Sequence, residues 1–213
     1  MITPRSLARP PAARPPWRFN RLEIDLILAG VAAAWRRLPA ATRARGQQEP
    51  PVNEALAAQL DEEIQAQIEP WQQLAVSAVE KGPELTDHRG ERLEKRPDVV
   101  LRLVGRWSAP HGRHCGAFIE CKRIDREHSR RLTHYRSQGI ARFVDGRYAW
   151  QMATAFMVAY VADGTPLSDL EVSELRTADG VEFGRTEHAR AFDVMDAPAG
   201  PIELWHAWLR TET

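Results

Sequence analysis

The stretch "GAFIECKRID", residues 116–125, places two charged side chains inside a segment that is otherwise apolar. Such a run is typical of a buried β-strand. Successive side chains of a strand point to opposite faces, so Glu120 and Lys122 share one face and Ile119 and Cys121 share the other. The charged pair is either an ion pair that discourages sheet association or the centre of a site. The surrounding segments decide between these two readings.

A second strand precedes this one. "PDVVLRLVGRW", residues 97–107, is rich in Val and Leu and follows a proline that suits a strand start. The turn-forming residues 108–115 separate the two strands by about the length of a hairpin loop. If the strands pair as a hairpin, Asp98 lies near Glu120 and Lys122. Two carboxylates and one lysine then meet at one end of the sheet.

This grouping of side chains has a clear chemical use. Carboxylate oxygens are hard ligands suited to Mg²⁺, which proteins commonly hold with one or two carboxylates plus substrate phosphate. The bound ion lowers the pKa of a coordinated water and stabilises charge on phosphorus. A nearby lysine can orient or deprotonate the attacking water and neutralise the developing charge. The residues therefore predict phosphoryl chemistry without a covalent nucleophile.

The remaining elements define the fold class. Apolar residues recur every four positions over 51–70 and predict an amphipathic helix that Pro70 ends. A glycine at 139 weakens a second helix by about 1 kcal/mol relative to alanine. In chain order we expect helices over 21–38 and 51–70, strands over 72–81, 97–107 and 116–124, a helix over 126–144, a strand over 153–164, a short helix over 166–180 and a final strand or edge element over 200–211.

These elements predict an α/β architecture with a mixed central sheet of about four core strands flanked by helices. The length of 213 residues suits one domain. We expect that domain to span residues 17–213, with its core at about 50–162. Residues 1–16 are rich in Pro and Arg and predict a flexible tail.

Composition excludes several classes of protein. Apolar residues make up 43% and charged residues 27%, as in an ordinary soluble domain. The two cysteines form neither a disulfide framework nor a zinc-ligand set, which favours a cytoplasmic location. The longest apolar run, from Leu26 to Trp35, is too short to span a bilayer, and the N-terminus lacks a secretory signal. No membrane association is expected.

Net charge is zero, but the charges are unevenly distributed. Residues 121–162 hold eight basic side chains against three acidic ones. This asymmetry is compatible with a polyanionic partner and equally with a solvated arginine-rich helix. If the partner is a nucleic acid, the arginines would position phosphates without reading bases.

The two strands together resemble the PD-(D/E)xK nuclease superfamily, which has the restriction-endonuclease-like fold. Pro97–Asp98 matches the PD element, and Glu120–Cys121–Lys122 matches the (D/E)xK element 22 residues later. The order helix, strand, strand, strand, helix, strand agrees with this family over about residues 50–162. The match of motif and context together is more specific than the short motif alone.

The resemblance implies a Mg²⁺-dependent endonuclease, with Mn²⁺ as a substitute ion, that hydrolyses nucleic acid in a defence or restriction-type system. DNA is expected ahead of RNA. Asp98, Glu120 and the Cys121 carbonyl would ligate metal, and Lys122 would position water. The family also places an acid on the preceding helix; Glu54 occupies that place, with Asp61, Glu63 and Glu23 as alternatives. The expected nucleic-acid contacts are Arg123, Arg126, Arg130, Arg131, Gln138 and Arg142.

Two other classes stay open. One is a catalytically inactive nucleic-acid-binding module on the same fold, and the other is a structural subunit. A homodimer or a partner protein is compatible with each. Replacement of Glu120 separates a nuclease from a binding module, because only the nuclease loses an activity with that carboxylate.

Overall fold

A computed structural model describes residues 16–44, 47–91, 96–104, 114–125, 130–194 and 197–212, without the side chains of residues 130, 131 and 197. Its centre is a seven-stranded mixed sheet in the order β1-β2-β3-β4-β9-β6-β5. The strands are β1 (Val76–Lys81), β2 (Val99–Leu103), β3 (Ala117–Ile124), β4 (Thr154–Val161), β5 (Ser173–Ala178), β6 (Val181–His188) and β9 (Ile202–Arg210). A separate two-stranded ribbon pairs β7 (Asp193–Val194) with β8 (Ala197–Pro198).

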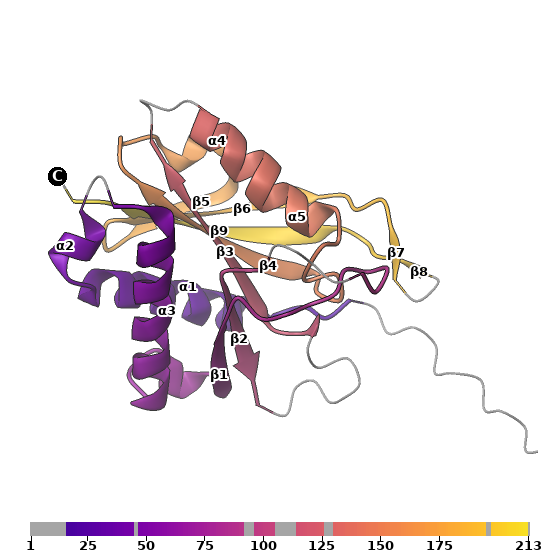
Figure 1. Cartoon of the computed structure of the whole chain (residues 1–213), viewed down its shortest axis with the longest axis horizontal. Helices are drawn as coiled ribbons and strands as arrows, with labels where there is room; N and C mark the ends of the chain where they lie inside the picture. The colour runs from indigo at the N-terminus through magenta and orange to yellow at the C-terminus, as the bar shows by residue number, and fades with distance from the viewer. Residues whose placement is uncertain are drawn as a thin grey trace, which may run out of the picture.

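Helices cover both faces of the sheet. They are α1 (Arg21–Arg37), α2 (Ala40–Arg43), α3 (Glu49–Gln65), α4 (Arg130–His134) and α5 (Ala141–Val144), with a π-helix η4 (Tyr135–Ile140) between the last two and short 3₁₀ turns η1 (Trp71–Gln73) and η5 (Leu167–Leu170). Figure 1 shows α1 and α3 together on one side of the sheet and the segment α4–η4–α5 on the other. The predicted α/β class is confirmed. The predicted four strands were too few, because the sheet continues beyond β4.

The buried centre of the sheet is parallel. β3 pairs with β4, and β4 pairs with β9, both in parallel register. Every residue of β4 is buried, and so is every residue of β9 except the last. Strands buried on both faces read as continuous apolar runs, and parallel neighbours need a helical crossover such as α4–η4–α5. The expectation that 200–211 could be an edge element is corrected, since β9 lies between β4 and β6.

The segment 166–180 is not the expected helix. It forms the single turn η5 followed by strand β5, which pairs with β6 so that Ala178 faces Val181. Asp179 and Gly180 connect the two strands with φ values of 51° and 76°. Two consecutive positive φ angles define the type I′ turn that Asp-Gly favours in hairpins. The glycine that suggested a helix end is therefore a hairpin turn residue.

Helix α1 begins and ends where the sequence predicts. Asn20 accepts a hydrogen bond from the Glu23 backbone N at 2.9 Å, and the Glu23 carboxylate accepts one from the Asn20 N at 2.8 Å. This capping box satisfies two amide groups that the helix itself leaves unpaired. The buried face of α1 then packs across the sheet, where Trp35 stacks on Tyr160 with ring centroids 5.2 Å apart. No helix within the described ranges is long and apolar enough to cross a membrane.

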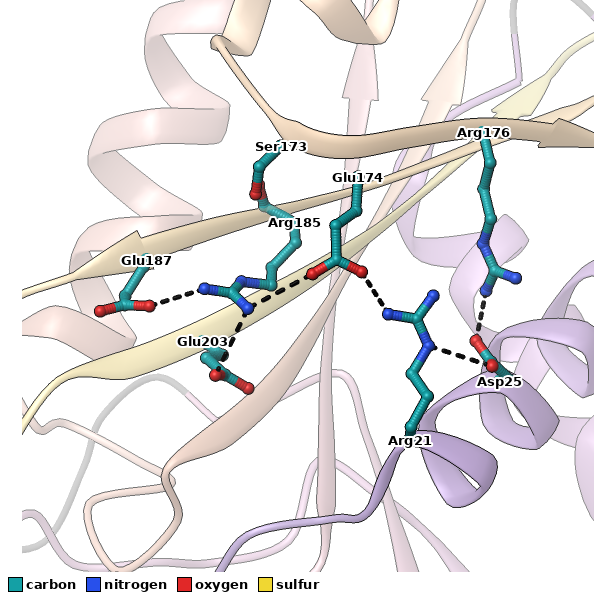
Figure 2. A network of polar contacts seen from close by, with 8 residues as sticks. All are labelled: Arg21, Asp25, Ser173, Glu174, Arg176, Arg185, Glu187 and Glu203. Atoms are coloured by element: carbon teal, nitrogen blue, oxygen red, sulfur yellow. Dashed lines mark hydrogen bonds and ion pairs between the residues drawn. The ribbon is translucent and has the colours of Figure 1, made fainter.

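A chain of alternating charges fastens α1 to the C-terminal strands. Arg21 pairs with Asp25 at 3.1 Å and also with Glu174 on β5. Arg185 on β6 joins Glu174 at 3.3 Å to Glu187 at 2.7 Å. Figure 2 shows how these side chains meet above β5, β6 and β9, with Arg176, Glu203 and Ser173 beside them. Partly exposed pairs each contribute little, so the network orients α1 more than it stabilises the fold.

Replacing Gly30 with alanine is expected to lower the free energy of unfolding by about 1–3 kcal/mol, because overpacking a closed core is costly. A Cβ at Gly30 would lie 2.1 Å from Cζ2 of Trp71, whose ring is fully buried. This cost exceeds the ~1 kcal/mol that alanine gains in helix propensity. Urea denaturation measures the change. Ala29→Val, on the exposed side of the same helix, should cost less than about 1 kcal/mol; equal effects would contradict the packing model.

Candidate active site

Strand β3 extends beyond its pairing with β2, and two carboxylates accept hydrogen bonds from the backbone of this unpaired part of β3. β2 pairs with β3 only as far as Ile119, while β3 continues to Ile124. The Cys121 N donates to Asp98 Oδ2 at 2.7 Å, and the Arg123 N donates to Glu49 Oε2 at 3.0 Å. Amide-to-carboxylate bonds replace the missing strand, so the backbone stays satisfied where the sheet opens. The opening places both carboxylates beside the charged face of β3.

The ammonium group of Lys122 lies at the centre of this opening. Its Nζ is 2.7 Å from Glu120 Oε1, 2.7 Å from the Cys121 carbonyl oxygen, 3.0 Å from Glu49 Oε1 and 3.9 Å from Asp98 Oδ2. We call these five groups the Lys122 cluster. The structure thus brings together Asp98, Glu120, Lys122 and the Cys121 carbonyl, which the sequence had placed in one site.

Glu49 is the acid that the helix contributes, and it is a residue that the sequence reasoning did not single out. Pro50 and Pro51 occupy the first turn, where proline is favoured, so α3 starts at Glu49. Asn53, four residues later on the same helix face, donates to Asp98 Oδ1 at 2.9 Å. Glu49 and Asn53 therefore share one face at the start of α3. Glu49 contributes its own carboxylate to the site, and Asn53 holds the carboxylate of Asp98. The signal was present as an acid directly before two prolines.

The expected Glu54 lies outside the Lys122 cluster. It is exposed, and one residue beyond Asn53 it is turned about 100° away from the face that meets Asp98. The alternative acids are also engaged elsewhere among the described residues. Glu63 is fully buried and pairs with Arg37 at 2.8 Å, Asp61 accepts from Gln65, and Glu23 caps α1.

Glu120 forms the base of the site. Its side chain is fully buried, and Tyr148 donates a hydrogen bond to its Oε2 at 2.5 Å. The Arg142 guanidinium contacts Glu120 Oε1 and donates to the Tyr148 hydroxyl at 3.1 Å. One carboxylate oxygen is thus fixed by Tyr148, and the other is shared between Arg142 and Lys122. Arg142, expected at the nucleic-acid surface, is instead buried because the buried carboxylate needs a partner.

Burial dominates the electrostatics of these groups. It raises the pKa of Glu120 to about 7, and the neighbouring Asp98 adds to the rise, while Lys122 and Arg142 oppose it. Burial also raises the pKa of Asp98, against the effect of Lys122. Burial alone would lower the pKa of Lys122, but the surrounding carboxylates keep it above its ordinary value. The lysine is therefore an ammonium ion throughout the physiological pH range.

The helix over the site approaches β3 and β4 through a glycine. A Cβ on Gly139, within the π-helix η4, would lie 2.5 Å from Met157 Cε and 3.7 Å from Lys122 Cγ. π-Helical turns inside α-helices often mark functional sites. Here the turn lets the helix contact the stem of Lys122. Gln138 beside it is half-buried.

The other predicted nucleic-acid contacts differ in their placement. Arg123 is tied to the Gln47 carbonyl oxygen and, at 3.4 Å, to Asp125. Arg126 and the side chains of Arg130 and Arg131 lie outside the described part of the chain. Among the arginines whose side chains the structure describes, Arg142 lies at the base of the site and Arg123 at its flank.

The Lys122 cluster is open to solvent on the side of Glu49 and Asp98. Glu49 and Asp98 have side-chain exposures of 31% and 22%, whereas Glu120 has none. Glu49, in the first turn of α3, and Asp98, directly before β2, therefore form the exposed end of the cluster, and Glu120 forms its buried end. The donor set consists of hard oxygens that suit Mg²⁺ or Mn²⁺. Among the described residues, no three His, Cys, Asp or Glu side chains are arranged as the ligands of a metal ion. In the Lys122 cluster the lysine ammonium lies between the carboxylates.

Comparisons with known proteins return no match: no family model, no curated protein and no solved structure resembles this chain closely enough to count. Function is therefore inferred from the geometry of the Lys122 cluster and from the sequence motif that forms it.

Proposed function

We propose that this protein is a metal-dependent nuclease of the PD-(D/E)xK type that hydrolyses phosphodiester bonds, with DNA as the favoured substrate. The observation that supports it best is the convergence of four oxygens, from α3, β3 and the residue before β2, on the partly buried Lys122. These elements come from distant parts of the sequence. The sheet also loses hydrogen bonds between strands where β3 continues without β2. A site of this kind fits a catalytic role better than a purely structural one.

The residues fit a divalent cation by donor type. Asp98, Glu120, Glu49 and the Cys121 carbonyl would hold it, and Asn53 and Tyr148 would orient two of these carboxylates through their hydrogen bonds. When bound, the ion would supply an acidified water and stabilise charge on the phosphate. Lys122 is near enough to the same oxygens to orient that water and neutralise negative charge in the transition state.

The carboxylates also bear on the alternative of an inactive binding module. Glu49 and Asp98, the two partly exposed acids of the Lys122 cluster, repel a phosphate backbone unless a cation lies between them. A module that only binds nucleic acid would gain affinity by losing them. The two free, buried cysteines, Cys115 and Cys121, support a reducing cytoplasmic location as part of the proposal.

Cleavage assays with the full chain test the proposal. Purified protein is incubated with single- and double-stranded DNA and RNA, including closed circular plasmid, in Mg²⁺, Mn²⁺ or EDTA. We expect metal-dependent cleavage that EDTA abolishes, with nicking or linearisation of the plasmid as the sign of an endonuclease. Binding without cleavage in every metal would favour the inactive module, and neither binding nor cleavage would favour a structural subunit.

A further inference from the structure

The Lys122 ammonium has the surroundings of a bound cation. Three oxygens lie within 3.0 Å of Nζ and a fourth lies at 3.9 Å. These are the same four oxygens that are proposed above to hold a divalent ion. One set of donors therefore has two candidate cations, one of which is part of the chain.

The two cations cannot share the site as it stands. Mg²⁺ needs oxygen ligands at about 2.0–2.1 Å in near-octahedral geometry. An ion that took Glu120 Oε1, the Cys121 carbonyl oxygen and Glu49 Oε1 as ligands would compete for the same oxygens that Nζ contacts at 2.7, 2.7 and 3.0 Å. A divalent ion and an ammonium group a few ångströms apart repel strongly at the effective dielectric of a partly buried site.

The lysine has a route out of the cluster. Its stem is held against the π-helix, since a Cβ on Gly139 would come within 3.7 Å of Lys122 Cγ, but its side chain keeps 12% exposure at the open side. The long, flexible stem allows the head group to move while the stem stays packed.

We propose that Lys122 is a built-in competitor of the divalent cation: its ammonium balances the charge of Glu49, Asp98 and Glu120 until the ion displaces it toward the open side of the site. The inference rests on the proposed metal site but not on cleavage. It reverses the ordinary expectation for a residue of a metal site, since loss of Lys122 should strengthen metal binding. A lysine that only completes a structural ion pair would leave metal affinity unchanged or, through loosened carboxylates, weaker.

Metal titration of the Lys122→Met variant tests the inference. Mn²⁺ affinity is measured by calorimetry and by the loss of the free-ion paramagnetic resonance signal, at low ionic strength and pH 8, where released protons compete least. We expect the variant to bind Mn²⁺ about tenfold more tightly than the unaltered protein, or better. Adding Glu120→Gln to Lys122→Met should abolish the gain. Lys81→Met, at an exposed lysine on the edge strand β1, should leave the affinity unchanged.

The outcomes separate the two proposals. Equal or weaker Mn²⁺ binding by Lys122→Met, with unaltered circular dichroism, would overturn the competitor role even if the unaltered protein cleaves DNA. Absence of Mn²⁺ binding in both proteins would overturn it as well. Cleavage by the unaltered protein, measured in parallel, decides the nuclease proposal by itself. If the methionine variant does not fold, Lys122→Gln, which retains a hydrogen-bond donor for the same oxygens, gives the same comparison.

Discussion

Replacing Glu120 with glutamine is expected to lower the rate of metal-dependent cleavage about a thousandfold, in the range seen when a group that stabilises the transition state is lost. The amide has nearly the same shape but no negative charge, so it would be a poor ligand for a divalent ion. Its NH₂ group would also face a donor, because Arg142 and Lys122 approach one oxygen and Tyr148 donates to the other. Initial rates at saturating Mg²⁺ and Mn²⁺ measure the loss.

Measurements of nucleic-acid binding and of folding distinguish a loss of catalysis in Glu120→Gln from a loss of structure. Nucleic-acid binding in Ca²⁺ or EDTA, followed by gel shift, should persist in Glu120→Gln. The matched control is Glu203→Gln on β9, a buried glutamate that pairs with Arg18 at 3.0 Å and belongs to the network in Figure 2. Cleavage should survive that change. A nuclease that keeps its activity in Glu120→Gln would rule out the proposed metal site.

Glu49→Gln and Glu54→Gln are expected to differ sharply although both change an acid on α3. Glu49→Gln should lower cleavage by about 10–100-fold, the usual cost of disturbing ligands or their supporting contacts at a metal site. It removes the charge beside Lys122 and weakens the acceptor that holds the Arg123 N. Glu54→Gln should leave the rate within about twofold, because that side chain is exposed and lies off the face of α3 that meets the Lys122 cluster.

The pair also tests where the helix begins. Metal-dependent rates and melting temperatures of both variants are compared under the same conditions. If Glu54→Gln is the damaged variant and Glu49→Gln is active, α3 must present a different face to β3 than the structure shows.

The centre of the site was accessible from the sequence because strand geometry is local. Side-chain alternation alone put Glu120 and Lys122 on one face, and the expected antiparallel pairing of the two strands brought Asp98 to them; Nζ of Lys122 is 3.9 Å from Asp98 Oδ2. The general α/β class followed from the order of apolar runs. These inferences depend on periods of two residues and on a nearby turn, which a single sequence records well.

The rest depended on tertiary contacts. Sequence patterns do not fix the first residue of a helix. The predicted helix began at Pro51, two residues after the observed start of α3, and this was enough to overlook Glu49. The count of basic residues after β3 could not reveal that Arg142 turns inward, because only the buried position of Glu120 requires it. Likewise, Asp179–Gly180 fits a helix end or a hairpin, and only the presence of β6 decides.

The charge chain of Figure 2 has a consequence for how the protein is made. Helix α1 leaves the ribosome early, yet its partners include Glu174 and Arg176 on β5, and the indole of Trp35 donates to the Arg210 carbonyl oxygen at 3.3 Å. Contacts between residues so far apart in sequence form slowly, and α1 has no complete surface to pack on until the last strand exists. The face of α1 that meets β5 and β9 therefore stays uncovered until these strands have been made, even though Trp71 can pack on Gly30 earlier.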